Sequence, residues 1–186
     1  EDLEAALLAA RIIAYAQGFR ILAAASADYD WNLDFARIAE IWNPLIRETS
    51  VTFTTVEKTS SSLTADLALK AELGHPFLVL EQEGIVQGFA TYGFFRPGPG
   101  YLRTMEHTVI LAPAIHGQGA GRLLMARLGQ YASSRDVHSL IGGVSSENSA
   151  GIAFHRRIGF EEIARLSEVG YKFDRWMDLV LMQRKL

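Results

Sequence analysis

The chain has 186 residues, of which 49% are hydrophobic and 21% are charged, and its net charge is −3. This length and composition are typical of one globular domain with a full hydrophobic core. The small negative charge gives no electrostatic support for a nucleic-acid partner, and the absence of cysteine excludes disulfides and thiolate zinc sites. The absence of cysteine fits a cytoplasmic protein, and because no apolar run reaches membrane-spanning length we expect no membrane partner.

Helical patterns dominate the first 74 residues. Apolar side chains recur at helical spacing over residues 2–25, and a second pattern covers residues 33–43 and is expected to end near Pro44. Residues 48–59 are rich in β-branched side chains, which predicts an extended segment or a loop. Residues 60–73 begin with serines and predict a capped helix that ends at Gly74.

Strands and helices alternate in the rest of the chain. Residues 76–95 predict two strands joined by a tight turn at Glu83 and Gly84. Further strands are expected at 103–113, 139–145, 161–173 and 175–186, with helices at about 120–135 and 148–158. Strands flanked by helices indicate an α/β fold, in detail an α+β mixed sheet with helices on its faces.

A glycine-rich loop lies between the strand at 103–113 and the helix that follows it. Gly117, Gly119 and Gly121 occupy alternate positions there. Glycines at a helix start let an anion approach backbone N–H groups that have no intrahelical acceptor. The dinucleotide fingerprint does not fit this spacing, and the lysine of a P-loop is missing. On spacing alone, a plain strand-to-helix turn remains an equal alternative.

Two blocks of sequence favour an anion-binding loop over a plain strand-to-helix turn. APAIHGQGAGRLL, residues 112–124, resembles the pyrophosphate loop of the GNAT superfamily of N-acetyltransferases, and NSAGIAFHRRIGF, residues 148–160, resembles its second block. His116 departs from the usual Gln or Arg of that loop. Residues 42–186 resemble the phosphinothricin/methionine sulfoximine N-acetyltransferase branch. The resemblance implies the GNAT fold and the acetylation of a small amino-acid-like amine by acetyl-CoA.

The resemblance also implies which residues bind coenzyme A. We expect contacts from the strand that precedes the loop, from the loop itself and from the start of the helix at 148. These residues are Val109, Ile110, Leu111, His116, Gly117, Gln118, Gly119, Ala120, Gly121, Arg122, Asn148 and Ser149. The local alternative for Asn148 is a helix N-cap, which is a common role for Asn at that position.

Two residues are expected to be catalytic. Glu106 is implied as the base, acting through a water, and the alternative is an exposed strand carboxylate. His155 stands where many members of the family carry a tyrosine near the sulfur, so it is a candidate donor to the thiolate. The alternative for His155 is a histidine packed in its helix. His107 ranks below Glu106 because neighbouring residues of a regular strand face opposite sides.

The acceptor site is expected around the loop RPGPGY and around residues 53–54. The resemblance implies that Phe53, Arg96, Tyr101 and Arg103 bind the substrate, and an arginine suits a carboxylate through a bidentate pair. Lys172, Trp176 and Asp178 also match the branch, and we interpret them as structural or dimer-contact residues. No spacing of His, Asp and Glu predicts a metal site.

The first 42 residues have a different resemblance. AYAQGF and WNLDFARIAEIW resemble the helical C-terminal domain of 6-phosphogluconate dehydrogenase. We therefore expect a fusion, with a helical segment at 1–42 joined to a transferase domain at 43–186. An extra N-terminal helix would then replace the first transferase strand and contribute to a homodimer. The alternative is a divergent N-terminus in which FRILAAAS still forms that strand.

Two other functions remain open at this stage. The same chemistry could act on a protein or peptide amine rather than on a small molecule. The chain could also be an inactive fusion that keeps only coenzyme A binding, because its first strand is expected to be missing.

Overall fold

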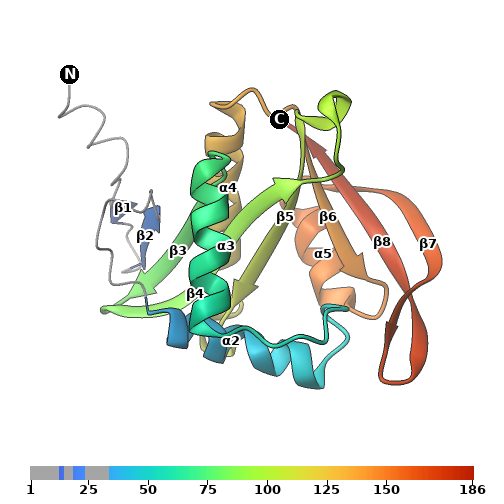
Figure 1. Ribbon diagram of the computed structural model, residues 1–186, viewed down its shortest axis with the longest axis horizontal. Coiled ribbons are helices and arrows are strands. Elements are labelled where there is room, and N and C mark those ends of the chain that lie inside the picture. The colour runs from blue at the N-terminus through green and yellow to red at the C-terminus, as the bar shows by residue number, and fades with distance from the viewer. Residues whose placement is uncertain (1–12, 15–18, 24–33) are drawn as a thin grey trace. The chain divides into compact units, whose positions relative to one another are not determined.

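The computed structural model describes residues 13–14, 19–23 and 34–186 (Figure 1). These residues form two compact units, which are described separately. The first unit contains the described residues up to Ile41, Lys58–Tyr92 and Val109–Leu128. The second unit contains Trp42–Glu57, Gly93–Thr108 and Gly129–Leu186.

The described residues of the first unit include four strands and the helix α3 (Ser60–Glu72). The strands β1 (Ile13–Ala14), β2 (Phe19–Ala23), β3 (Phe77–Gln82) and β4 (Ile85–Phe94) follow one another in antiparallel order. Glu83 and Gly84 have φ values of 54° and 79°, so the predicted tight turn between β3 and β4 is confirmed. The helix α3 begins with a capping box between Thr59 and Ser62.

The N-terminal strands correct one prediction. The sequence predicts a helix over residues 2–25, but Ile13–Ala14 and Phe19–Ala23 are strands, and the remainder of that segment lies outside the described residues. β2 pairs antiparallel with β3, from Phe19 opposite Gln82 to Ala23 opposite Leu78. Pairing with β3 outweighs the local helical periodicity because it satisfies the backbone of an apolar strand. The strand that the inactive-fusion hypothesis expected to be missing is therefore present.

The second unit contains a mixed sheet. β5 (Thr104–Leu111) pairs in parallel with β6 (Ser139–Ser145), through register positions that run from Thr104 to Glu106. β6 pairs antiparallel with β8 (Arg175–Lys185), which pairs antiparallel with β7 (Glu161–Lys172). The helix α5 (Ser149–Arg157) packs on β6, β7 and β8. This combination of parallel and antiparallel pairs confirms the predicted mixed sheet with helices.

Two further helices, α2 (Phe35–Glu48) and α4 (Ala120–Ser133), each have residues in both units. α2 continues past Pro44, so its predicted end near that proline is wrong. Its apolar side chains Ile38, Ile41 and Ile46 are buried, and their packing maintains the helix beyond the proline. α4 follows the glycine loop, as predicted. Within the described part of the chain, none of the helices has the length and apolar character needed to span a membrane.

Candidate active site

The glycine loop of the first unit has the geometry of an anion site. Gly117 and Gly119 have φ values of 77° and 82°, which favour glycine, and a Cβ added to either would meet no atom within 4 Å. The N–H of Leu123 donates to the carbonyl of Gly119 at 3.0 Å and begins the hydrogen-bond ladder of α4. The N–H groups at positions 120–122 precede that bond and are available to a ligand.

The side chains next to these glycines shape the loop. Nε2 of His116 lies 3.3 Å from the carbonyl oxygen of Leu111, and Nε2 of Gln118 donates to the carbonyl of Ala114 at 2.9 Å. Both side chains therefore bind backbone within the loop. The strand residues expected to contact the cofactor, Val109–Leu111, form the end of β5, where Ile110 is buried.

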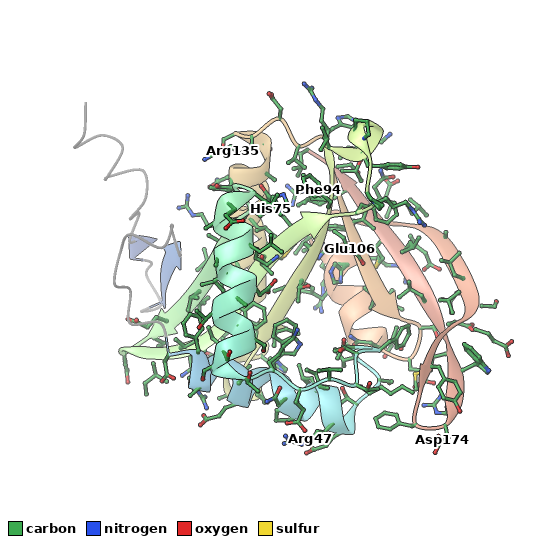
Figure 2. All side chains as sticks on the ribbon, viewed as in Figure 1. Arg47, His75, Phe94, Glu106, Arg135 and Asp174 are labelled. Atoms are coloured by element: carbon green, nitrogen blue, oxygen red, sulfur yellow. The ribbon has the colours of Figure 1, made fainter. Side chains whose placement is uncertain are left out.

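Glu106 and His107 lie on opposite faces of β5, which confirms the expected alternation. Glu106, labelled in Figure 2, keeps solvent access, whereas His107 is buried. Partial desolvation raises the pKa of the Glu106 carboxyl above its usual range, and the charge of Arg96 opposes this shift. A carboxylate with a raised pKa is a better proton acceptor near neutral pH. The environment of Glu106 is thus suited to a general base.

Two consecutive glycines of β6 make room for these side chains. A Cβ at Gly143 would lie 2.9 Å from Oε1 of Glu106. A Cβ at Gly142 would lie 2.8 Å from Cε1 of His107, on the other face of the sheet. The two glycines in LIGGVS were a signal of close approach by neighbouring groups, but the sequence could not identify those groups.

His155 belongs to a buried pair of histidines. Its Nε2 lies 2.9 Å from Nε2 of His107, and its Nδ1 lies 2.7 Å from the carbonyl oxygen of Gly151. Burial lowers the pKa of both rings, and burial together with His155 brings the pKa of His107 to about 3. Both ring nitrogens of His155 are engaged in this arrangement. The geometry therefore favours the packed histidine over the proton donor.

Asn148 is the N-cap of α5, as its local alternative predicted. Its Oδ1 accepts from the N–H of Gly151 at 2.8 Å, and a Cβ at Gly151 would lie 2.4 Å from Nδ2 of Asn148. The cap uses the oxygen of the amide, and since Nδ2 has no hydrogen-bond partner among the described residues, this donor can serve a ligand. Ser149 is the first residue of α5.

Arg96 and Tyr101, both predicted to bind the acceptor, lie against the same ring. The guanidinium carbon of Arg96 is 5.1 Å from the ring centre of Phe95, and the rings of Phe95 and Tyr101 are 6.5 Å apart. The carbonyl of Arg103 accepts from His138 and Ser139 and fixes the backbone where β5 begins. The predicted loop thus presents a cation and an exposed aromatic side chain together.

Phe53, the fourth predicted acceptor residue, packs on β7. A Cβ at Gly170 would lie 2.3 Å from a ring carbon of Phe53. Lys172, interpreted from the sequence as a structural or dimer-contact residue, donates to the carbonyls of Thr49 and Thr52. These contacts join positions about 120 residues apart, so sequence reasoning could not predict them.

Comparisons with known proteins reveal the family. Residues 73–162 match the model of the acetyltransferase (GNAT) domain, and residues 1–72 match that of the 6-phosphogluconate dehydrogenase C-terminal domain. The chain is 37% identical over 153 residues to an L-methionine sulfoximine/L-methionine sulfone acetyltransferase of Salmonella typhimurium, covering 82% of this chain and 90% of that protein. The chain belongs to the GNAT acetyltransferases.

Two solved structures resemble this acetyltransferase. A ribosomal-protein-alanine N-acetyltransferase from Brucella melitensis is 39% identical, with a TM-score of 0.79 over 82% of this chain and 94% of that one. A phosphinothricin acetyltransferase from Sinorhizobium meliloti, in complex with acetyl-CoA, is 27% identical, with a TM-score of 0.77 over 82% of this chain and 83% of that one.

These relationships confirm the predicted fold, activity and cofactor. The protein is an N-acetyltransferase that uses acetyl-CoA. When bound, acetyl-CoA supplies the thioester that carries the acetyl group. The open glycine loop, with its donor amides at a helix start, fits a pyrophosphate. Within the described residues, no group of three or more His, Asp or Glu side chains could hold a metal ion.

Proposed function

We propose that this acetyltransferase acetylates the amine of a small amino acid resembling methionine sulfoximine or phosphinothricin. The observation that carries the proposal is the 37% identity to the Salmonella typhimurium L-methionine sulfoximine/L-methionine sulfone acetyltransferase, of which the chain covers 90%. The placement of Arg96 and Tyr101 around the ring of Phe95 supports it, because a guanidinium suits the carboxylate of an amino acid.

We assign the cofactor contacts to the residues already predicted. The loop at 117–122 binds the pyrophosphate through its available N–H groups at positions 120–122, with His116 and Gln118 shaping the loop. The strand residues Val109–Leu111, together with Asn148 and Ser149, bind the pantetheine arm. The open space over the glycines and the unused Nδ2 donor of Asn148 support these roles.

In the proposed reaction, Glu106 accepts a proton from the acceptor ammonium through a water. The neutral amine then attacks the thioester carbonyl, a new C–N bond forms and the C–S bond breaks, and the proton that the attacking nitrogen loses passes through solvent to the departing thiolate. The raised pKa of Glu106 supports its role as the base. His155, as placed, does not supply the proton that the thiolate takes up, because both of its ring nitrogens are engaged.

The acceptor would be bound by Arg96, Tyr101, Arg103 and Phe53, with Thr54 beside them. Arg96 would pair with the carboxylate, while Phe53 and Tyr101 would enclose the side chain. An acceptor held in this way presents its amine in a fixed direction, which lowers the entropic part of the barrier.

An assay of thiol release tests the acceptor class. The enzyme is incubated with acetyl-CoA and each of methionine sulfoximine, methionine sulfone and phosphinothricin, and with a peptide that begins with alanine. We expect turnover with the free amino acids. Turnover restricted to the peptide would support the alternative, protein N-acetylation, which is the activity in the name of the Brucella melitensis protein.

We also propose that the protein is a homodimer. β7 is the last strand in the order of the second unit, and the β7–β8 hairpin exposes Ile163, Val169, Tyr171, Phe173 and Trp176. An edge strand with exposed apolar side chains is favourable only when another surface covers it. A second copy of the same hairpin would supply that surface. The helix first expected to form the dimer falls on residues that are strands or lie outside the described part.

The division into a segment at 1–42 and a transferase domain at 43–186 remains part of our proposal of a fusion. The match to the dehydrogenase domain supports a foreign origin for the N-terminal part, although it extends to residue 72. α2 crosses positions 42 and 43 without a break. If the chain is a fusion, the join therefore lies within a helix that continues into the transferase domain.

A further inference from the structure

Lys172 connects β7 to the loop that follows α2. Its side chain is only 3% exposed, and its Nζ donates to the carbonyl oxygens of Thr49 and Thr52, each at 2.7 Å. One ammonium group thus binds two carbonyls that stand three residues apart. This contact fixes the chain turn between them.

The position of Lys172 suits the end of α2. Thr49 directly follows Glu48, the last residue of that helix. The final carbonyls of a helix have no intrahelical partner and carry the negative end of the helix dipole, so a cation there satisfies both requirements. The hydroxyl of Thr49 also donates to the carbonyl of Leu45 at 2.7 Å, which orders the same turn.

Gly170 provides a second contact with this loop. A Cβ at position 170 would lie 2.3 Å and 2.4 Å from two ring carbons of Phe53, so the ring lies directly on the backbone of β7. Gly170 is not among the residues with positive φ. The ring of Phe53, rather than the backbone conformation, therefore explains the glycine.

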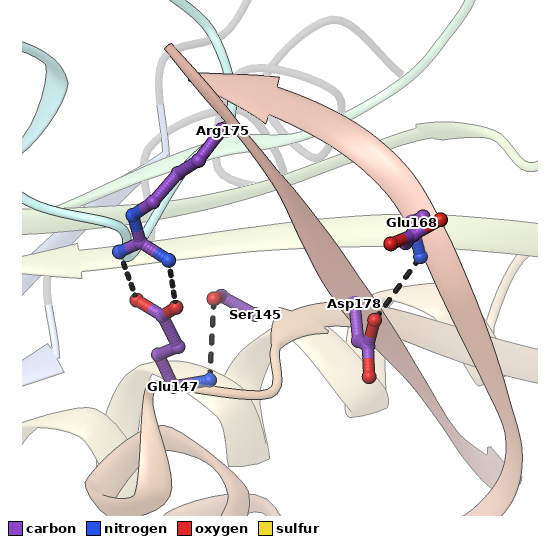
Figure 3. A network of polar contacts seen from close by, with 5 residues as sticks. All are labelled: Ser145, Glu147, Glu168, Arg175 and Asp178. Carbon is purple, nitrogen blue, oxygen red and sulfur yellow. Dashed lines mark hydrogen bonds and ion pairs between the residues drawn. The ribbon is translucent and has the colours of Figure 1, made fainter. Parts of the chain in front are cut away.

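Polar contacts hold the hairpin itself in place (Figure 3). Arg175 forms a bidentate ion pair with Glu147, and the carboxylate of Asp178 accepts from the N–H of Glu168. Ser50 of the loop also hydrogen-bonds to Glu147, and Arg175 and Ser50 together lower the pKa of Glu147 to about 2. The loop and the hairpin therefore share a partner, in addition to the contacts of Lys172 and Gly170.

We infer that the β7–β8 hairpin positions the acceptor loop, residues 49–54, and that Lys172 and Gly170 are the positioning residues. Lys172 binds loop carbonyls and Gly170 admits the ring of Phe53, so both act through the loop rather than on the substrate. The inference rests on the proposed function, in which Phe53 and Thr54 contact the acceptor. Misplacement of a binding group by about 1 Å can cost on the order of 10²-fold in rate.

Two substitutions with matched controls test this inference. Lys172→Met keeps an unbranched side chain of similar length but removes the donor, and Gly170→Ala displaces the ring. The controls are Lys185→Met, at an exposed position of β8, and Gly93→Ala, where a Cβ meets no atom within 4 Å. The measurements are the KM for the amino acid at saturating acetyl-CoA, the Kd of coenzyme A, and hydrogen exchange of the peptide 49–57.

We expect both test variants to raise the acceptor KM by about tenfold or more and to speed exchange in residues 49–57. The Kd of coenzyme A should not change, and the controls should behave as the parent protein does. An unchanged acceptor KM, or unchanged exchange of the loop, would overturn the inference.

A double variant protects the test against simple misfolding. If Gly170→Ala acts through the ring of Phe53, then Gly170→Ala with Phe53→Leu should restore slow exchange of the loop, and two independent effects would instead add. Exchange needs no substrate, so it tests the contact even if the parent protein acetylates none of the amino acids. Failure to acetylate any of the amino acids would refute the proposed acceptor class. The exchange measurement would still decide whether Lys172 and Gly170 order the loop.

Discussion

His107 and His155 meet with their Nε2 atoms 2.9 Å apart inside the second unit. Because the carbonyl of Gly151 can only accept, Nδ1 of His155 carries a hydrogen and donates to it. In the neutral pair, Nε2 of His155 is then the acceptor and Nε2 of His107 the donor. This chain of donors has a defined direction, and an added proton would disturb it.

Acid should therefore destabilise the protein through this pair. The pKa of His107 is about 3 in the folded state and near 6.5 when unfolded, so the unfolded state binds more protons between these values. Stability is fully present above about pH 6.5 and falls toward pH 3, with a slope of at most about 1.4 kcal/mol per pH unit from His107. Urea unfolding at a series of pH values measures this slope.

The variant His107→Asn should have a shallower slope than the parent protein, whereas the exposed control His138→Asn should not. Burial also lowers the pKa of His75, so part of the dependence of stability on pH should remain in both variants. Equal slopes in the parent and in His107→Asn would show that the pair does not couple folding to pH.

Glu106→Gln should lower kcat by on the order of 10²-fold, because general-base catalysis contributes about that much. Burial raises the pKa of Glu106, so activity in the parent protein should fall as the pH drops through a value above the ordinary 4.5 of a glutamate. The variant should lose this acidic limb of the profile of kcat/KM and keep its affinity for coenzyme A. The exposed Glu161→Gln is the matched control. Parent-like turnover in Glu106→Gln would assign the base to another group.

Gly119→Val should abolish the stabilisation by coenzyme A, measured as the rise in Tm on its addition. At about 100 times its Kd, a ligand stabilises a protein by about 2.7 kcal/mol. Gly84→Val is the control, since Gly84 has a φ of 79° against 82° for Gly119 and also has open space around a new Cβ. Both variants should be strained, but only Gly119→Val should lose the response. A full response in Gly119→Val would contradict the assignment of the loop.

Tyr171→Glu together with Trp176→Glu should convert a dimer into a monomer if the hairpin forms the interface. The two rings lie opposite each other in the β7–β8 register with centres 5.0 Å apart, and both are about half exposed. Light scattering should give twice the chain mass for the parent protein and the single mass for the double variant. A monomeric parent protein would refute the dimer, and a dimeric variant would place its interface elsewhere.

The sequence predicted the elements that depend on local patterns. The turn at Glu83 and Gly84, the glycine loop before α4 and the cap at Asn148 each follow from the residues at those positions. The family motifs supplied the cofactor and the reaction. Predictions failed where tertiary pairing opposed local preference, as in β2, which lies where a helix was expected, and in α2, which passes Pro44.

Contacts between distant positions could not be predicted. Nothing near His155 in the sequence indicates that His107 will face it, and nothing near Lys172 indicates that Thr49 and Thr52 will bind it. These contacts depend on strand order and register, which the sequence alone did not specify. They also bear on the proposed roles, since both ring nitrogens of His155 are engaged in this pair.

The adjacent glycines of β6 offer a way to alter the enzyme one face at a time. Neither Gly142 nor Gly143 has a positive φ, so the backbone itself would accept an alanine at each position. The conflict at Gly143 is with the carboxylate of Glu106, and the conflict at Gly142 is with the imidazole of His107. Pairing a larger residue at one glycine with a shorter partner would change either the surroundings of Glu106, the proposed base, or the packing around His107. An engineer could therefore tune the chemistry and the acid tolerance of this protein as separate properties.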